Sequence, residues 1–202
     1  MKKRIITALC AVTIMSFAGC AQQGVQFENI DTKDVISTND VKQSDFTNDL
    51  DGLEKYFIKL RYIPEKTEPT EMLYKVIGAK DGDRYIFNVN GTNVAMELYE
   101  YDTDNLNEDA KRVLDEIKET GKFHVFKNKD IDGDNTYPAV ISDNGKYMMI
   151  YNDPSKEAKN ITQKNVVELT FKSYYKDNKP VDPEPSKTEE SSAESKEGSS
   201  KD

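Results

Sequence analysis

Three aspartates are the residues best spaced for metal chemistry. In N-K-D-I-D-G-D-N-T, Asp130, Asp132 and Asp134 alternate, as oxygen ligands do at the first positions of a calcium loop. The rest of that pattern is missing, because the glycine comes too early and Ile141 stands where the loop needs a glutamate. Asp-Gly clusters are also ordinary turn sequences. The segment is therefore either a plain turn or a weak calcium site, and no other cofactor is expected.

Tyrosines form the second candidate, a ligand-binding surface. Side chains alternate between the two faces of a strand, so a strand over 92–101 places Tyr99 and Tyr101 together, opposite Val94, Met96 and Leu98. A strand over 146–151 likewise places Tyr147 and Tyr151 on one face. If these tyrosines share an uncovered face, they form a platform for a sugar, peptide or protein. The alternative is that a helix or loop covers them.

Residues for nucleophilic or zinc catalysis are scarce. His124 is the one histidine, and both cysteines fall within the first twenty residues. A nucleophile needs a neighbouring base, and a zinc site needs three or four clustered ligands. The sequence contains neither G-x-S-x-G nor a Gly-rich phosphate loop after a strand. We expect no enzyme, although paired carboxylates stay open because the chain has 37 acidic residues.

The first residues read as an export signal. Lys2, Lys3 and Arg4 precede an apolar run that ends in Phe17-Ala18-Gly19-Cys20. This ending resembles the lipobox of bacterial lipoproteins, with Phe17 in place of the usual leucine. The resemblance implies that Cys20 carries diacylglycerol, that the leader 1–19 is removed, and that the protein is anchored on the extracytoplasmic side of the cell membrane. Two acyl chains suffice for stable anchoring.

The charge of the mature chain is strongly negative. The whole chain has 28 basic and 37 acidic residues, and loss of Lys2, Lys3 and Arg4 with the leader takes the net charge from −9 to −12. A nucleic-acid partner is therefore not expected. The expected partners are the membrane, through the lipid on Cys20, and an envelope protein or a cell-wall ligand.

Composition divides the mature chain into three parts. Residues 20–43 are polar with isolated apolar residues and predict a flexible tether after Cys20. Residues 44–175 predict one domain, which is long enough for a single core. Residues 176–202 hold prolines, serines and acids with almost no apolar residue, so they predict a disordered tail.

Hydrophobic periodicity predicts the elements of the domain. We expect helices over 45–61, capped by Ser44, over the segment that ends at Gly121, and over 162–175. Asn90-Gly91 predicts a type I′ hairpin between strands 84–89 and 92–101. A third strand over 122–127 and a hairpin over 137–142 and 146–151 follow. Residues 69–78 fit a short helix, and a strand over 72–80 is the alternative. The fold class is α+β, with helices packed on a largely antiparallel five-stranded sheet in two layers.

One further resemblance covers about residues 92–151. V-A-M-E-L-Y-E-Y-D-T-D-N, then I-K-E-T-G-K-F and Y-P-A-V-I-S-D-N-G-K-Y-M-M-I-Y, look like the core of small lipoproteins from low-GC Gram-positive bacteria. The resemblance implies location and fold class, and it supplies no site residues.

Three functions fit these observations. The first is a membrane-anchored, non-catalytic binding or accessory module. The second is a structural or regulatory lipoprotein that acts through an envelope protein partner. The third is a carboxylate-dependent envelope hydrolase, which needs two carboxyl groups in a cleft with opposed pKa shifts.

Overall fold

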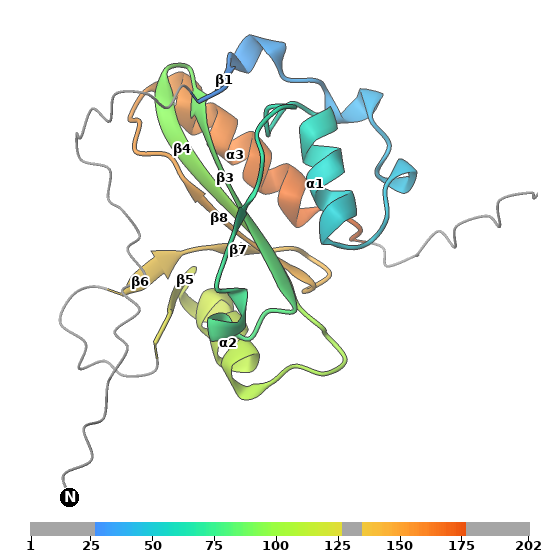
Figure 1. The fold of residues 1–202 in the computed structure, drawn as a ribbon, viewed down its shortest axis with the longest axis vertical. Helices are drawn as coiled ribbons and strands as arrows, with labels where there is room; N and C mark the ends of the chain where they lie inside the picture. The colour runs from blue at the N-terminus through green and yellow to red at the C-terminus, as the bar shows by residue number, and fades with distance from the viewer. Residues whose placement is uncertain (1–26, 127–134, 177–202) are drawn as a thin grey trace, which may run out of the picture.

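The fold is built on one mixed sheet, seen in a computed structural model that describes residues 27–126 and 135–176 (Figure 1). Its main path runs β1-β3-β4-β8-β7, and β2 pairs with Asp83 and Arg84 near the start of β3. The strands are β1 (Asn29–Ile30), β2 (Thr70–Glu71), β3 (Asp81–Val89), β4 (Thr92–Glu100), β7 (Val140–Ile141) and β8 (Tyr147–Asn152). The β1–β3 pair is parallel and the other pairs are antiparallel. The predicted α+β class is confirmed.

The β3–β4 hairpin is the longest pairing in the sheet. Asn90 and Gly91 both have positive φ, 50° and 84°, as a type I′ turn requires. This turn fixes the register, so Val89 faces Thr92 and Asp81 faces Glu100. The predicted hairpin is confirmed, and it extends three residues further toward the N-terminus than expected.

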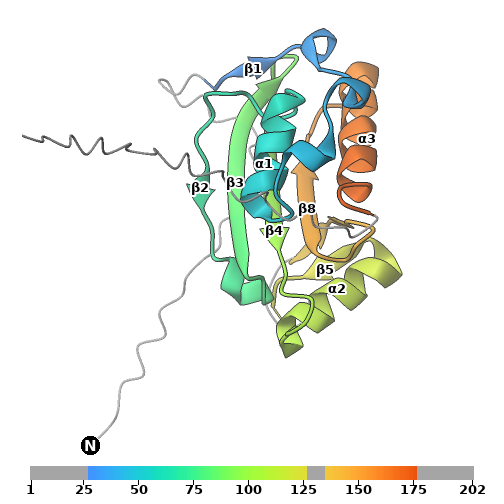
Figure 2. The ribbon, with the colours of Figure 1, turned by 90° about the vertical axis from the view of Figure 1, so that its right-hand side faces the viewer.

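Helices α1 (Leu50–Lys59) and α3 (Ala158–Lys172) lie side by side over one face of the sheet (Figure 2). They bury the odd-numbered side chains of β3 and β8 and the even-numbered ones of β4 in the larger core. The sheet contributes Tyr85, Phe87, Val89, Val94, Met96, Leu98, Tyr147, Met149 and Tyr151 to this core. The helices contribute Leu53, Phe57, Val167 and Phe171.

Among the residues that the structure describes, the opposite face is covered mainly at one end. Helix α2 (Glu108–Thr120), the 3-10 helix η4 (Tyr74–Ile77) and the ribbon of β5 (Lys122–His124) and β6 (Thr136–Pro138) gather there. Their core holds Ala110, Val113, Leu114 and Ile117 of α2 against Tyr99, Tyr101, Met148 and Ile150 of the sheet. The fold therefore has a third, partial layer beyond the two expected, and β5 pairs with β6 instead of joining the main sheet.

The helix ends follow their capping residues. Helix α1 begins at Leu50 because Asp49 accepts a 2.8 Å hydrogen bond from the Gly52 amide, so the predicted start near 45 with Ser44 as cap is wrong. A side chain at position 52 would collide with the Thr47 carbonyl oxygen, which explains the glycine inside the first turn. Helix α2 ends where predicted, at Gly121, which has a positive φ of 72°.

Residues 27–43 belong to the fold, which corrects the predicted flexible tether 20–43 for this part. β1 pairs with β3, three 3-10 helices follow (Thr32–Asp34, Thr38–Asp40 and Gln43–Asp45), and Ile30 and Val41 are buried. The apolar residues here match neither helical nor strand periodicity. Their burial depends on partners that lie far away in the sequence.

The segment that precedes α1 contacts the last described residues of the chain. The Gln43 side chain accepts a 3.0 Å hydrogen bond from the Tyr175 amide, and the Tyr174 hydroxyl donates to the Thr47 carbonyl at 2.9 Å. The Tyr175 hydroxyl donates to the carbonyl of Phe46. The segment before α1 and the end of α3 are thus joined across 127 to 132 residues.

Candidate functional site

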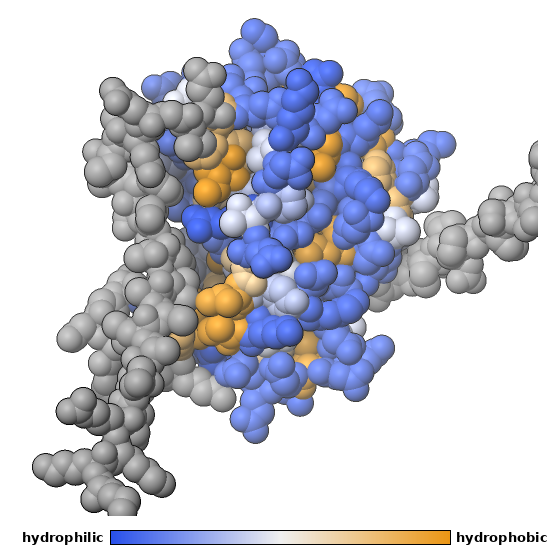
Figure 3. Space-filling view, viewed as in Figure 1, coloured by the Kyte–Doolittle hydropathy of each residue, from blue (hydrophilic) through white to orange (hydrophobic). Residues whose placement is uncertain are grey.

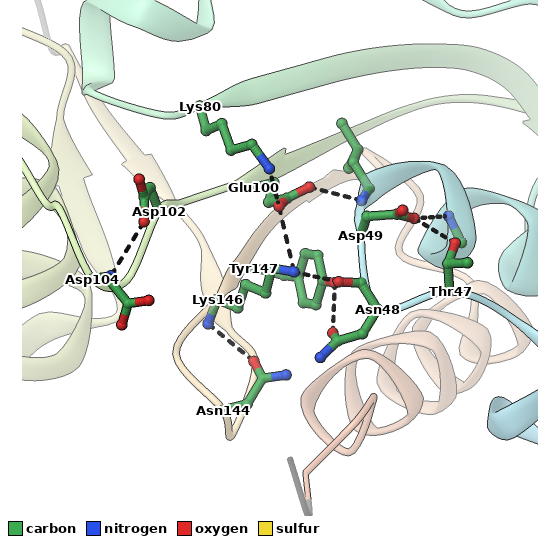
Figure 4. Close-up of polar contacts among 12 residues, drawn as sticks. Thr47, Asn48, Asp49, Lys80, Glu100, Asp102, Asp104, Asn144, Lys146 and Tyr147 are labelled. Atoms are coloured by element: carbon green, nitrogen blue, oxygen red, sulfur yellow. Dashed lines mark hydrogen bonds and ion pairs between the residues drawn. The ribbon is translucent and has the colours of Figure 1, made fainter. Parts of the chain in front are cut away.

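Two buried or half-buried carboxyl groups, one beside the start of α1 and one on α1 itself, have opposite surroundings. The first is Glu100, at the end of β4, whose side chain is 4% exposed. It accepts hydrogen bonds from the Leu50 amide at 2.9 Å and from Lys80 Nζ at 2.8 Å, and Lys146 Nζ lies 3.4 Å away (Figure 4). We call these four residues the Glu100 cluster.

The loop before α1 completes the surroundings of the Glu100 cluster. Lys146 also donates to the Asn48 carbonyl, and the Tyr147 hydroxyl donates to Asn48 Oδ1 at 2.8 Å (Figure 4). The sheet end is thereby fixed to the N-terminus of α1, where the exposed amides and the helix dipole favour a negative charge. Both oxygens of Glu100 have partners, so the cluster is suited to holding the fold together.

Asp49 is the capping residue beside this cluster. Burial disfavours its charged form, but the hydrogen bonds from Thr47 and from the Gly52 amide outweigh burial and lower the pKa of Asp49. The charged cap therefore stabilises the fold at neutral pH.

The second carboxyl group is Glu54, one turn further along α1. It faces Asp83 of β3, and its Oε1 is buried with no hydrogen-bond partner within the described ranges. Burial, together with the charge of Asp83, raises the pKa of Glu54 to about 8. Burial also raises the pKa of Asp83. We call Glu54 and Asp83 the acid pair.

Within the described ranges, no basic side chain forms an ion pair with Glu54 or Asp83, and Lys55, next to Glu54, pairs with Asp51 at 2.6 Å instead. Besides Asp83, Glu54 interacts with the Tyr85 hydroxyl and with the charge of Asp51, and Asp83 is further affected by Asp81 and Glu71. Burial and then the charge of Glu54 raise the pKa of Tyr85 as well. Such surroundings favour a bound proton or a positively charged group.

A surface hollow of about 440 Å³ adjoins the acid pair. It lies between the 71–76 segment and the first residues of β3, and its wall includes Asp83 and the exposed Leu73. Its other lining residues are Glu71, Met72, Tyr74, Lys75, Val76, Asp81 and Gly82. The hollow therefore combines apolar side chains, which gather over η4 in Figure 3, with three acids and one lysine.

The predicted tyrosine platform is absent. Tyr99 and Tyr101 are buried in the smaller core under α2, while Tyr147 and Tyr151 are buried in the larger core on the other face. Their exposed fractions are all 5% or less. Alternation gave the right face within each strand, but the register of β4 against β8 sends the two pairs to opposite sides of the sheet.

The remaining predicted site residues lie elsewhere. Asp130, Asp132, Asp134 and the lipidation candidate Cys20 are outside the described residues. Within residues 27–126 and 135–176, no group of three or more His, Cys, Asp and Glu side chains is arranged to hold a metal ion. In the same ranges, none of the helices is long and apolar enough to cross a membrane.

His124 has a structural position at the edge of α2. Its Nδ1 lies 3.1 Å from Glu116 Oε2, and Arg112 of the same helix donates to the His124 carbonyl at 2.7 Å. These contacts of Arg112 and Glu116 fix β5 to α2.

Sequence patterns missed the acid pair, although part of a signal was there. Glu54 lies four residues after Leu50 and three before Phe57, so helical spacing places it on the inward face of α1. Asp83 alternates with Tyr85 and Phe87 on the same strand face. Only the packing of α1 on β3 shows that the two acids meet.

Comparison of the chain with protein-family models, with curated proteins and with solved structures finds no match. The functional proposal therefore depends on the chain's own residues.

Proposed function

We propose that the chain is a lipid-anchored, extracytoplasmic lipoprotein with a non-catalytic binding or accessory role. The observation that carries this proposal is the leader, in which a basic start and an apolar run end at Phe17-Ala18-Gly19-Cys20. Cleavage before Cys20 also leaves the mature chain without any free thiol, which suits an extracytoplasmic protein.

The start of the fold supports a close association with the membrane. Phe27 is seven residues beyond Cys20, and β1 begins at Asn29. Seven extended residues span at most about 25 Å. An acylated Cys20 would therefore hold the domain next to the bilayer instead of at the end of a long tether.

Lipidation is tested by producing the full chain in a bacterial host and measuring the mass of its N-terminal peptide. The expected result is a peptide that begins at a diacylglycerol-modified Cys20, in a protein that fractionates with membranes. The Cys20→Ala variant should leave the membrane fraction. An unmodified Cys20 in the wild-type chain would contradict the proposal.

The hollow beside the acid pair is the ligand site that we propose within this function. Three acids on its wall, of which Asp83 interacts with Glu54, favour a ligand with a positively charged group, such as an amine-bearing peptide or cell-wall fragment. Leu73 and Met72 would contact an apolar part of the same ligand. The acid pair does not favour the hydrolase alternative, because both pKa values rise and that chemistry needs one carboxyl group kept ionised.

Ligand binding is tested by thermal unfolding of the full chain with short lysine-containing peptides and with amine-bearing wall fragments. A ligand at a hundredfold excess over its Kd stabilises the folded state by about 2.7 kcal/mol, which raises Tm by several degrees. Asp83→Asn should remove this rise, whereas Asp104→Asn, on an exposed turn, should keep it. An equal rise in both variants would exclude the hollow as the site.

A further inference from the structure

The outward face of α3 is unusual for a water-exposed helix. Among the described residues, four large aliphatic side chains are strongly exposed, and three of them are on α3: Ile161 at 48%, Val166 at 40% and Leu169 at 67%. They lie opposite the buried Asn160, Val167 and Phe171, and the exposed residues between them are the uncharged Thr162 and Asn165. We call Ile161, Val166 and Leu169 the α3 aliphatic face.

The charges around the α3 aliphatic face are positive. Helix α3 holds three lysines, Lys159, Lys164 and Lys172, and one acid, Glu168, a net charge of +2. Glu168 lies 3.8 Å from Lys164. Helix α2, by contrast, holds five acids and three basic residues, a net charge of −2. The positive charge of α3 thus stands out in a chain whose net charge is negative.

The start of α3 lies close to the point where the chain leaves the fold toward Cys20. Asn90, in the β3–β4 turn, donates to the buried Asn160 at 3.0 Å and accepts from the Thr32 amide at 3.3 Å. Asn29 of β1 accepts from the Gly91 amide at 3.0 Å. One turn therefore joins β1 to the residue that precedes Ile161.

We propose that the α3 aliphatic face, with its lysines, docks on the anionic headgroup surface of the membrane. The inference rests on the proposed lipid anchor, because Cys20 would hold Phe27, two residues before β1, within about 25 Å of the bilayer. A helix that exposes aliphatic side chains flanked by lysines is typical of one lying in the membrane interface. Lysines close to anionic lipids add electrostatic attraction. The acidic remainder of the domain would then face away from the lipid.

The experiment uses the full, lipidated chain with an environment-sensitive fluorophore on Leu169→Cys. This thiol is unique in the mature chain once Cys20 is acylated. The matched control carries the same fluorophore on Glu119→Cys, at an exposed position of α2. Each chain is reconstituted into vesicles of phosphatidylcholine alone or of phosphatidylcholine with phosphatidylglycerol, and flotation confirms that the chain is bound.

The expected result is a blue shift and at least a twofold emission increase at position 169 on the anionic vesicles, with no change at position 119. Replacing Lys159, Lys164 and Lys172 with Gln should cancel the change, as should high salt. A chain that floats with the vesicles but shows equal emission at both positions overturns the docking proposal and leaves the lipid anchor intact. A shift at position 169 that depends on protein concentration instead of lipid charge overturns it in favour of a second copy. An unmodified Cys20 overturns the proposed function, and the docking proposal with it.

Discussion

Glu100 lies at the N-terminus of α1 and Glu54 is part of that helix, yet their surroundings are opposite. Glu100 has an amide and two lysines as partners, whereas Glu54 has another acid beside it and one buried oxygen without a hydrogen bond within the described ranges. The first arrangement stabilises the folded state as a charged group. The second stabilises it best when Glu54 holds a proton. A buried carboxyl group that forms no ion pair among the described residues is the better candidate for binding a ligand.

The largest effect is expected at Glu100. Glu100→Ala leaves the buried Leu50 amide without its acceptor and Lys146 without its counter-charge, so the free energy of unfolding should fall by about 3–5 kcal/mol. Urea unfolding followed by far-UV circular dichroism measures it, since the chain has no tryptophan. Asp104→Ala, in the exposed turn, should change this free energy by less than about 0.5 kcal/mol. A small loss at Glu100 would mean that the cluster is not structural.

Glu54→Gln should raise the free energy of unfolding, whereas Glu100→Ala lowers it. The pKa of Glu54 rises from 4.5 to about 8 on folding, so the stability from its protonated form is fully present below pH 4.5 and is lost as pH rises through 8. At pH 8 the variant should therefore be more stable than wild type by about 1–2 kcal/mol, allowing for solvent screening. At pH 4.5 the two should be equal.

Urea unfolding at a series of pH values between 4.5 and 8 tests this difference. Asp104→Asn, measured in parallel, should follow the wild-type pH dependence. An unchanged pH dependence in Glu54→Gln would show that Glu54 is ionised in the folded protein and that the contrast with Glu100 does not hold.

Asp49→Ala should have an intermediate effect on the free energy of unfolding. Loss of the cap should lower the free energy of unfolding by about 1 kcal/mol at pH 7. The pKa of Asp49 is lowered, so its contribution is present above pH 3.8 and lost as pH falls further, the reverse of Glu54. Asp49→Asn should keep the cap and lose only this acid dependence, which thermal unfolding between pH 2 and pH 7 would detect. Equal losses for Ala and Asn would point to the charge alone.

The smallest effect is expected at Lys80. Its side chain is 58% exposed, and Glu100 keeps Lys146 and the Leu50 amide, so Lys80→Met should cost less than about 1 kcal/mol. Lys146→Met should cost more, because Lys146 is 24% exposed and also donates to Asn48. Double-mutant cycles with Glu100→Gln separate the two pairs. A larger coupling for Lys80 than for Lys146 would reverse this order.

Local patterns predicted what local contacts decide. The Asn90-Gly91 turn and the end of α2 at Gly121 depend on a few neighbouring residues, and both were predicted correctly. The predicted start of α1 is wrong because Phe46 fits the apolar period of the helix. Phe46 lies outside α1, and its ring packs 5.4 Å from that of Tyr56.

Long-range packing decided the rest. Ile30 and Val41 look like isolated apolar residues in a polar segment, but β3 and the helices bury them. The acid pair also depends on distant packing, because 29 residues separate Glu54 from Asp83. Strand alternation cannot give the β4–β8 register, and that register places the two pairs of tyrosines on opposite faces of the sheet.

The contacts between Tyr174, Tyr175 and the segment before α1 also bear on how the domain folds. Residues 43–47 are made early, but their hydrogen-bond partners are among the last described residues to be made. Closing a loop of 127 residues has an entropic cost that must be met before these contacts contribute. Non-local contacts of this kind slow folding. The larger core therefore reaches its final packing only after α3 is complete, so a chain cut short before α3 would expose that core and be prone to aggregate.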